Sequence, residues 1–352
     1  RAGIDVTVFV PEPQGGEEQL LDASAAAGKP GRIRLECLPV PPEDRFPGHY
    51  VRGRRLRSRA MLERYLSSGI EADFIYGQGL MGAEFAAARK RGVPLPPVGV
   101  NLHGYEMFQR AVDPRRKVEQ FLLRPSFRRV ARDADLVFSF SGKIRDIVER
   151  RIGVPGDRIV ELPNGIEPNW VRGAQATSGK RRSLVFIGRW ERRKGIEELT
   201  RAVSATSGLD FEIHFVGPIP PNHKLNLSNV HYHGTITDAD KMTEIIDAAD
   251  ALICPSYSEG MSTVILEAMA RGLAILATDV GANGELVDAE NGVLIPHAGQ
   301  VEIEAAIRQF VSWDDADLAA RKQVSSQRIL GYTWDRVAER TIDEIRCFLG
   351  ST

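Results

Sequence analysis

Residues 255–272 read PSYSEGMSTVILEAMARG, and this stretch decides the fold. The apolar run 251–254 before it is short and bounded, as a buried strand is. Within the stretch, apolar side chains recur at helical spacing and predict a helix with one apolar face. A strand, a loop of serine and glycine and then a helix present unpaired N–H groups and the positive end of the helix dipole. The pattern therefore favours a phosphate site at the start of this helix.

Two carboxylates, Glu259 and Glu267, lie eight positions apart in this stretch. At the helical rise per residue, eight positions separate the two carboxylates by about 12 Å. That span suits an elongated ligand with hydroxyls at both ends and phosphates between, as in a nucleotide sugar. The alternative is a solvated loop residue followed by an exposed helix residue, because Glu is a good helix former. The spacing alone leaves both interpretations open.

The composition is that of a soluble globular protein with two domains. At 352 residues the chain can build two cores, and its 43% apolar and 26% charged residues are ordinary. A net charge of −1 argues against a general nucleic-acid binder, which carries a basic excess. The three cysteines, Cys37, Cys254 and Cys347, form no CxxC pair, and no apolar run reaches the roughly 18 residues that span a bilayer. We therefore expect a cytoplasmic protein without a disulfide framework.

Charge is unevenly distributed along the chain. Residues 1–170 contain 27 Lys and Arg against 22 Asp and Glu, which points to an acidic acceptor or to peripheral contact with the inner face of a membrane. The apolar neighbours of these basic residues are spaced like an ordinary buried helix face, and we favour that reading over membrane contact. The basic residues are Arg52, Arg54, Arg55, Arg57, Arg59, Arg115, Arg116, Lys117, Arg124, Arg128, Arg129 and Arg132, and the apolar ones are Val118, Phe121, Leu122, Phe127 and Val130.

Short apolar runs alternate with helical patterns, which predicts an α/β fold with parallel sheets. Pro, Asn-Gly and a polar run near 165–182 are typical of a linker. Two Rossmann-like domains would face each other across a cleft, with ligands outside the carboxyl ends of the strands. We place an N-terminal domain at 1–168, a C-terminal domain at 169–333, and an amphipathic helix at 334–349 that could pack back on the first. The predicted strands are 6–10, 34–38, 74–77, 98–102, 136–140, 159–162, 184–187, 212–216, 230–233, 251–254, 274–277 and 293–295.

A basic loop follows the predicted strand 184–187. The chain turns at Gly188 and then delivers Arg189 and Lys194 before the next helix. Two cations at the carboxyl end of a strand suit a diphosphate, because Arg can grip it with two hydrogen bonds and Lys adds a point charge. The neighbouring Arg192 and Arg193 make a solvated basic loop an equal alternative.

His103 lies at another carboxyl end, directly after the strand 98–102. It could hydrogen-bond a sugar hydroxyl or transfer a proton, or it could cap the next helix. The other histidines, including His231 and His233, have no cysteine or carboxylate partner at metal-ligand spacing, so we assign no metal site. The Asp-x-Asp pairs lie at turns where Asp commonly caps helices. We identify neither a GxGxxG motif after a strand nor a P-loop motif, which argues against binding of NAD or a P-loop nucleotide.

Taken together, these motifs resemble the retaining glycosyltransferases of family 4 (glycosyl transferases group 1), which have the GT-B fold of two Rossmann-like domains. The resemblance covers most of the chain, although the family usually reads EGFG where this chain has EGMS (259–262) in the sugar pocket. The family's first strand and its glycine-rich loop would precede Arg1. The matching segments are LPNGIE (162–167), FIGRWERRKG (186–195), FVG (215–217), HGTIT (233–237), ADALICPSYSEGMSTVILEAMARG (249–272), ATDVGANGELV (277–287) and ENGVLIP (290–296).

The resemblance also implies roles for single residues. Arg189 and Lys194 would hold the donor diphosphate. Glu259 would contact the transferred sugar, and Glu267 would accept hydrogen bonds from the ribose hydroxyls. The remaining site residues are His103 near the reacting carbon; Gly188, Gly260, Met261, Ser262, Thr263 and Val264 around the diphosphate and sugar; and Thr235 and Ile236 at the nucleobase.

The activity implied is the retaining transfer of a sugar from a nucleoside diphosphate sugar, with UDP favoured over GDP, to a glycan, lipid-linked glycan or small-molecule acceptor. The two cations and the helix dipole would stabilise the leaving phosphate, so we expect no metal or other cofactor. No general base is evident, and the leaving phosphate would take the acceptor proton on the same face. Two alternatives remain, namely a nucleotide-sugar epimerase of GT-B fold and a non-catalytic nucleotide-sugar-binding protein.

Overall fold

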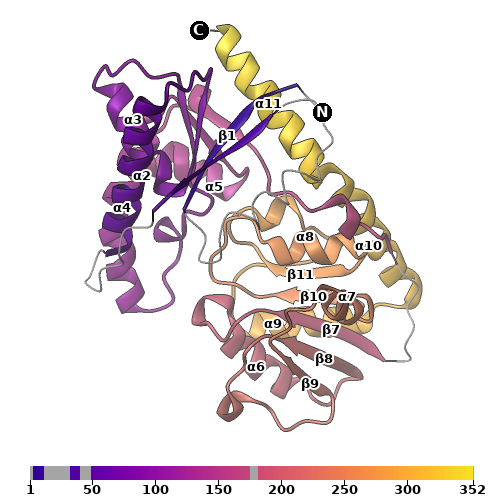
Figure 1. Cartoon of the computed structure of the whole chain (residues 1–352). Helices are drawn as coiled ribbons and strands as arrows, with labels where there is room; N and C mark the ends of the chain where they lie inside the picture. The colour runs from indigo at the N-terminus through magenta and orange to yellow at the C-terminus, as the bar shows by residue number, and fades with distance from the viewer. Residues whose placement is uncertain (1–2, 12–31, 40–48, 175–180, 352) are drawn as a thin grey trace. The chain divides into compact units, whose positions relative to one another are not determined.

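The computed structural model describes residues 3–11, 32–39, 49–174 and 181–351 (Figure 1). They form an α/β fold in which every strand pair with a described register is parallel. All twelve predicted strands are present, most with ends shifted by one or two residues, so the predicted class is confirmed.

The chain divides into two compact units. The first comprises Arg1–Leu102, Leu122–Phe138 and Ile152–Val160, and the second comprises His103–Phe121, Ser139–Arg151 and Glu161–Thr352. The predicted boundary at residue 168 and the packing of the last helix on the first domain stay predictions. Part of the predicted linker, 175–180, lies outside the described residues.

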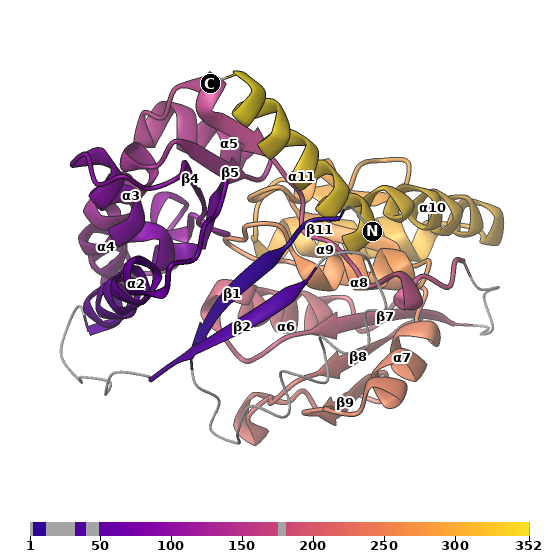
Figure 2. The same ribbon diagram turned by 45° about the horizontal axis from the view of Figure 1, so that its top comes forward.

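The first unit contains two sheets. A parallel pair, β1 and β2, forms a two-stranded sheet of its own, which Figure 2 shows as a separate ribbon. The other sheet has the order β3-β4-β5-β6. The ring of Phe138 packs there against Tyr76 at a centroid distance of 4.8 Å, over Gly99, where a Cβ would lie 2.5 Å from that ring. The strands are β1 (Val6–Pro11), β2 (Ile33–Leu38), β3 (Ile75–Gln78), β4 (Val98–Asn101), β5 (Leu136–Ser139) and β6 (Ile159–Glu161).

A glycine-rich turn connects β3 to a helix, and its GxGxxG pattern corrects the expectation that no such motif follows a strand. The residues GQGLMG (77–82) end β3 and form the short 3₁₀ helix η1 (Gly79–Gly82), from which α3 (Ala83–Lys90) continues. A Cβ on Gly77 would lie 2.6 Å from the Cα of Gly82, so both positions exclude side chains. The pattern allows the strand and helix to pack closely. Helix α2 (His49–Ser68) packs beside α3, with Arg55 bound to Glu84 at 2.7 Å.

Helix α4 (Pro114–Asp133) corrects the expectation of an ordinary buried helix face. Phe127 and Val130 are buried, but Val118, Phe121 and Leu122 are exposed by 60%, 67% and 65%. Helical periodicity identifies an apolar face without telling whether another element covers it. Among the described helices, none is long and apolar enough to cross a membrane.

The second unit is built on a six-stranded sheet of order β12-β11-β10-β7-β8-β9. Alternate residues of the strands, such as Phe186, Ile213 and Ile253, share one core with helices α6 (Ile196–Ala205) and α9 (Gln300–Ser312). The strands are β7 (Arg182–Ile187), β8 (Phe211–Val216), β9 (Val230–Gly234), β10 (Ala251–Cys254), β11 (Ala274–Thr278) and β12 (Gly292–Ile295). Their carboxyl ends position the loops described below.

Five further α-helices belong to the described part of the second unit. They are α5 (Lys143–Asp146), α7 (Ala239–Asp247), α8 (Thr263–Ala270), α10 (Asp315–Arg328) and α11 (Trp334–Ser351). Helix α11 matches the predicted helix 334–349 and begins against the Asn-Gly turn. A Cβ on Gly165 would lie 2.5 Å from the ring of Trp334, so glycine is required for this contact.

Candidate active site

The carboxyl ends of β7, β8 and β9 meet through three glycines. The N–H of Gly188 donates to the carbonyl of Val216 at 2.9 Å, and the N–H of Gly217 donates to the carbonyl of Gly234 at 2.8 Å. A Cβ on Gly217 would lie 1.9 Å from the carbonyl oxygen of Gly188, and its φ of +137° also favours glycine. Thr235 and Ile236 directly follow Gly234, and therefore lie at this edge of the sheet.

The basic loop after β7 reaches Glu259. It ends in the short 3₁₀ helix η6 (Arg192–Lys194), and Gly195 with φ +67° then turns the chain into α6. The Lys194 ammonium donates to Oε1 of Glu259 at 2.7 Å, and the Ser256 hydroxyl donates to the same oxygen at 2.7 Å. Glu259 is only 7% exposed, so these donors fix its carboxylate in place.

Helix α8 begins at Thr263, four residues after Glu259. The estimate of about 12 Å between the two carboxylates was therefore wrong in its premise, because a helical rise does not apply to the loop before Thr263. The N-cap residue Ser262 makes no side-chain hydrogen bond to the first turn. The N–H groups of Thr263 and Val264 consequently remain available to a ligand at the positive end of the helix.

Glu267 lies on the same face of α8 as Thr263, one turn further along. Burial raises the pKa of the Glu267 carboxyl, and no other cause contributes to the shift. Within the described part of the chain, no cation pairs with it to offset the loss of hydration. A carboxyl that is desolvated without a cation is a candidate binding group.

Met261 packs against the Asn-Gly turn. Its carbonyl accepts from the side-chain amide of Asn164 at 3.0 Å, and its sulfur lies 3.2 Å from the Asn164 backbone nitrogen. Met261 is buried, and Gly260 beside it has no room for a side chain. A Cβ on Gly260 would lie 2.6 Å from the carbonyl oxygen of His103, which belongs to the same unit.

His103 is the one non-glycine residue with a positive φ, +58°, among those the structure describes. Such a conformation is uncommon and clusters at functional sites. The residue is exposed, yet the part of its ring that faces protein loses hydration. This lowers the pKa of His103, and the nearby charge of Glu106 acts in the opposite direction. The imidazole is therefore neutral near pH 7.

Two family models match the chain over this architecture. The model described as Glycosyltransferase Family 4 matches residues 1–170, and the model described as Glycosyl transferases group 1 matches residues 181–312. Together they cover most of the sequence. The chain belongs to glycosyltransferase family 4.

A relative agrees with this membership, and solved structures share the fold. A Bacillus subtilis protein named as a teichuronic acid biosynthesis glycosyltransferase is 27% identical over 88% of this chain and 81% of its own. Sucrose-phosphate synthase of Thermosynechococcus elongatus has a TM-score of 0.74 at 17% identity, over 99% of both chains. The trehalose-6-phosphate protein of E. coli bound with UDP-2-fluoro glucose has a TM-score of 0.70 at 15% identity, over 97% of this chain and 98% of that one. The fold of this glycosyltransferase is therefore GT-B.

Arg193 is a residue that the sequence analysis of this glycosyltransferase missed. Its guanidinium donates to the Ser258 carbonyl at 3.0 Å and lies 3.3 Å from Oε2 of Glu259. Arg189, which was predicted to hold the diphosphate, is 73% exposed at its side chain and pairs with Glu191 at 2.9 Å. The 3₁₀ turn decides which arginine faces Glu259, and a run of basic residues does not reveal that turn.

Gly281→Ala is expected to disturb the Glu259 loop of this glycosyltransferase. Gly281 has φ +58°, and an added Cβ would lie 2.3 Å from the carbonyl oxygens of both Glu259 and Gly260. We expect a loss of about 1–3 kcal/mol in the free energy of unfolding, from overpacking and backbone strain. Chemical denaturation measures it, with Gly331→Ala as the control because nothing lies within 4 Å of that position. Equal losses in the two variants would contradict the tight packing of this loop.

Proposed function

We propose that this glycosyltransferase moves a sugar from a nucleoside diphosphate sugar to an acceptor with retention of configuration and without a metal. The observation that carries the proposal is the ion pair between the partly buried Lys194 and the buried Glu259, just before the start of α8. It puts a cation, a carboxylate and free helix N–H groups together at the carboxyl ends of parallel strands. Phosphate and sugar hydroxyls need these donors and acceptors.

Lys194 and Arg193 would stabilise the charge that develops on the leaving diphosphate. Both currently share the carboxylate of Glu259. A bound diphosphate would take over part of these cation contacts, and Glu259 would then accept from hydroxyls of the transferred sugar. The first-turn N–H groups of Thr263 and Val264 add fixed dipoles, which need no reorganisation during the reaction.

From the diphosphate, the nucleoside would extend away from the transferred sugar. Glu267 would accept hydrogen bonds from both ribose hydroxyls, and the backbone at Thr235 and Ile236 would contact the base. UDP is the favoured nucleotide, because the structural neighbour from E. coli is bound with a UDP sugar analogue.

The configuration of the anomeric carbon would be retained because the leaving phosphate itself takes the acceptor proton. The bond from the anomeric carbon to the phosphate oxygen breaks as the acceptor oxygen bonds on the same face, and the acceptor proton moves to the leaving phosphate. His103 is neutral near pH 7, because the loss of hydration on one side of its ring lowers its pKa, so it would hydrogen-bond a sugar hydroxyl without adding charge. A neutral hydrogen-bonding group at this position suits a substrate whose charge lies on its diphosphate.

A thermal-shift screen of nucleotide sugars tests the donor. A donor that binds the folded protein raises its apparent stability by mass action. We expect UDP-sugars to raise the melting temperature more than other nucleotide sugars do. No shift with any UDP- or GDP-sugar would contradict the proposal.

The acceptor proposed is a glycan, with a lipid-linked glycan at the inner face of the membrane as the favoured form. The B. subtilis relative is named for teichuronic acid biosynthesis, which supports a glycan acceptor. On α4, Val118, Phe121 and Leu122 form an exposed apolar face, with Arg115 and Arg116 exposed by 90% and 67% at their side chains. Apolar and basic side chains on one helix favour an anionic lipid surface.

Replacing Phe121 and Leu122 together with serine is expected to weaken binding to vesicles of phosphatidylglycerol at least tenfold. Removing two large apolar side chains from a lipid surface costs about 1.5–3 kcal/mol each. Co-sedimentation measures the binding, with Val301→Ser as a control because Val301 is 71% exposed on α9. Equal binding of both variants, or no binding by the unaltered protein, would contradict membrane contact through α4.

A further inference from the structure

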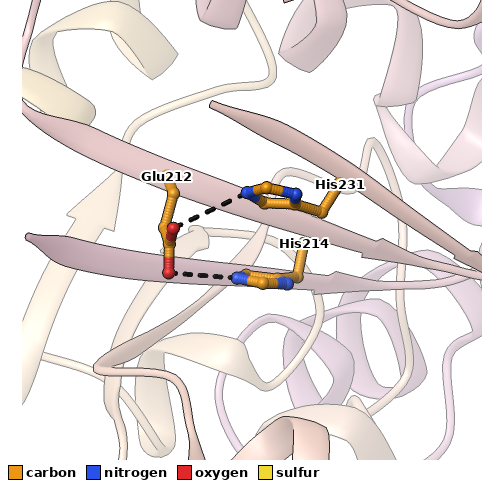
Figure 3. A group of neighbouring side chains, drawn as sticks. All are labelled: Glu212, His214 and His231. Atoms are coloured by element: carbon orange, nitrogen blue, oxygen red, sulfur yellow. Dashed lines mark hydrogen bonds and ion pairs between the residues drawn. The ribbon is translucent and has the colours of Figure 1, made fainter. Parts of the chain in front are cut away.

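Glu212, His214 and His231 gather on one face of β8 and β9, which the sequence analysis did not anticipate (Figure 3). Glu212 and His214 alternate along β8, so they point to the same side of the sheet. His231 stands opposite His214 in the register of β9, which is the edge strand. The sequence analysis was therefore wrong to give these histidines no carboxylate partner, because Glu212 is two residues from His214 on one strand, while the position of His231 depends on strand pairing.

The distances within the cluster fit a metal ion. Nε2 of His214 lies 3.3 Å from Oε1 of Glu212, and Nε2 of His231 lies 3.6 Å from Oε2 of Glu212. Two ligands at about 2.1 Å from a tetrahedral Zn²⁺ would be about 3.4 Å apart. The His214 and His231 rings are stacked at 4.8 Å, so one ring must turn toward the ion, and the 42% exposed His231 has room to do so.

His233 supplies the kind of support that metal-bound histidines usually have. Its Nε2 lies 2.9 Å from Nδ1 of His214. When His214 donates from Nδ1 to His233, its Nε2 carries the lone pair, which an ion between Nε2 and the Glu212 carboxylate could accept in place of the hydrogen bond that joins the two groups in the structure. Such a second hydrogen bond commonly fixes the tautomer and orientation of a metal-binding histidine.

We propose that Glu212, His214 and His231 bind a divalent transition-metal ion such as Zn²⁺, with water completing the coordination. Imidazole and carboxylate ligands in this number suit Zn²⁺. The ion would tie the edge strand β9 to β8, just before the proposed nucleobase residues Thr235 and Ile236. It takes no part in sugar transfer, which the proposed function assigns to the Lys194–Glu259 region.

Calorimetry of untagged, metal-stripped protein with Zn²⁺ alone tests the proposal. We expect one Zn²⁺ per chain, and a Co²⁺ absorption band of tetrahedral type when Co²⁺ replaces it. His231→Ala is expected to weaken Zn²⁺ binding at least tenfold. Because the His231 side chain is 42% exposed, we expect this variant to fold. Glu212→Gln and His214→Ala should weaken it similarly, with near-ultraviolet circular dichroism as the check on folding.

His297→Ala is the matched control. His297 lies 3.4 Å from Glu302, so it offers the same kinds of ligand without the third residue. Among the described residues, His297 belongs to no group of three ligands. Zn²⁺ should also raise the melting temperature of the unaltered protein and of His297→Ala, but not of His231→Ala. No Zn²⁺ binding by the unaltered protein, or unchanged affinity in His231→Ala, would overturn the proposal.

Discussion

Lys194→Ala is expected to weaken the binding of UDP or GDP at least tenfold and to reduce sugar transfer further. The variant loses a charge-assisted contact to the diphosphate of about 1.5–3 kcal/mol, where 1.4 kcal/mol corresponds to tenfold. It also leaves the buried Glu259 carboxylate with Arg193 and Ser256 as its remaining donors. That carboxylate would then repel the phosphate more strongly. Titration calorimetry with the nucleotide, followed by initial rates, measures both effects.

Lys224→Ala is the control for this prediction. Lys224 is an exposed lysine of the same unit whose ammonium lies 5.2 Å from the centre of the Tyr232 ring. Its removal should leave nucleotide affinity unchanged. Arg193→Ala and Arg189→Ala are measured in the same way, and we expect Arg193→Ala to lose more nucleotide affinity than Arg189→Ala. Unchanged affinity in Lys194→Ala would rule out its contact with the diphosphate.

Glu267→Gln is expected to stabilise the ligand-free protein at pH 7 while weakening donor binding at least tenfold. Burial raises the pKa of Glu267 in the folded state, so folding favours its protonated form. The stability from this group is present below the unfolded-state pKa and is lost as the pH rises through the folded-state pKa. At pH 7 the buried charge therefore costs stability, and glutamine removes that cost. Glutamine also loses the charged acceptor for the ribose hydroxyls, worth about 1.5–3 kcal/mol.

Melting temperatures at pH 7 and at acidic pH separate the two parts of the Glu267 prediction. The stabilisation should shrink in acid, where the native carboxyl is already neutral. Glu339→Gln serves as the control, because Glu339 is exposed on α11 and its removal should change neither stability nor affinity. A Glu267→Gln protein that melts lower than the unaltered one at pH 7 would contradict the account of an unpaired, desolvated carboxyl.

The sequence was sufficient for the strands and the fold class, while the roles of the site residues stay predictions. Apolar runs such as 251–254 are short, bounded and buried, so the run itself is enough to predict a strand. The sequence placed Glu259 and Lys194 after strands of one parallel sheet, but their ion pair was not predicted. Contacts that depend on a local turn could not be predicted, and the choice of Arg193 over Arg189 beside Glu259 is one such contact.

Two other features needed the folded chain. The exposure of Phe121 depends on what covers α4, and periodicity does not report that. The Glu212 cluster depends on the register between β8 and β9, which brings His231 opposite His214. In both cases the missing information is the placement of one element on another.

The central claim is that this glycosyltransferase transfers a sugar with retention from a nucleoside diphosphate sugar. Nuclear magnetic resonance and mass spectrometry of products, with UDP-sugars and a panel of glycan and lipid-linked acceptors, test it most directly. The account predicts released UDP and a glycosylated acceptor whose anomeric configuration matches that of the donor. An inverted product would contradict it, and so would a changed nucleotide sugar formed without acceptor, or donor binding with no turnover on any acceptor.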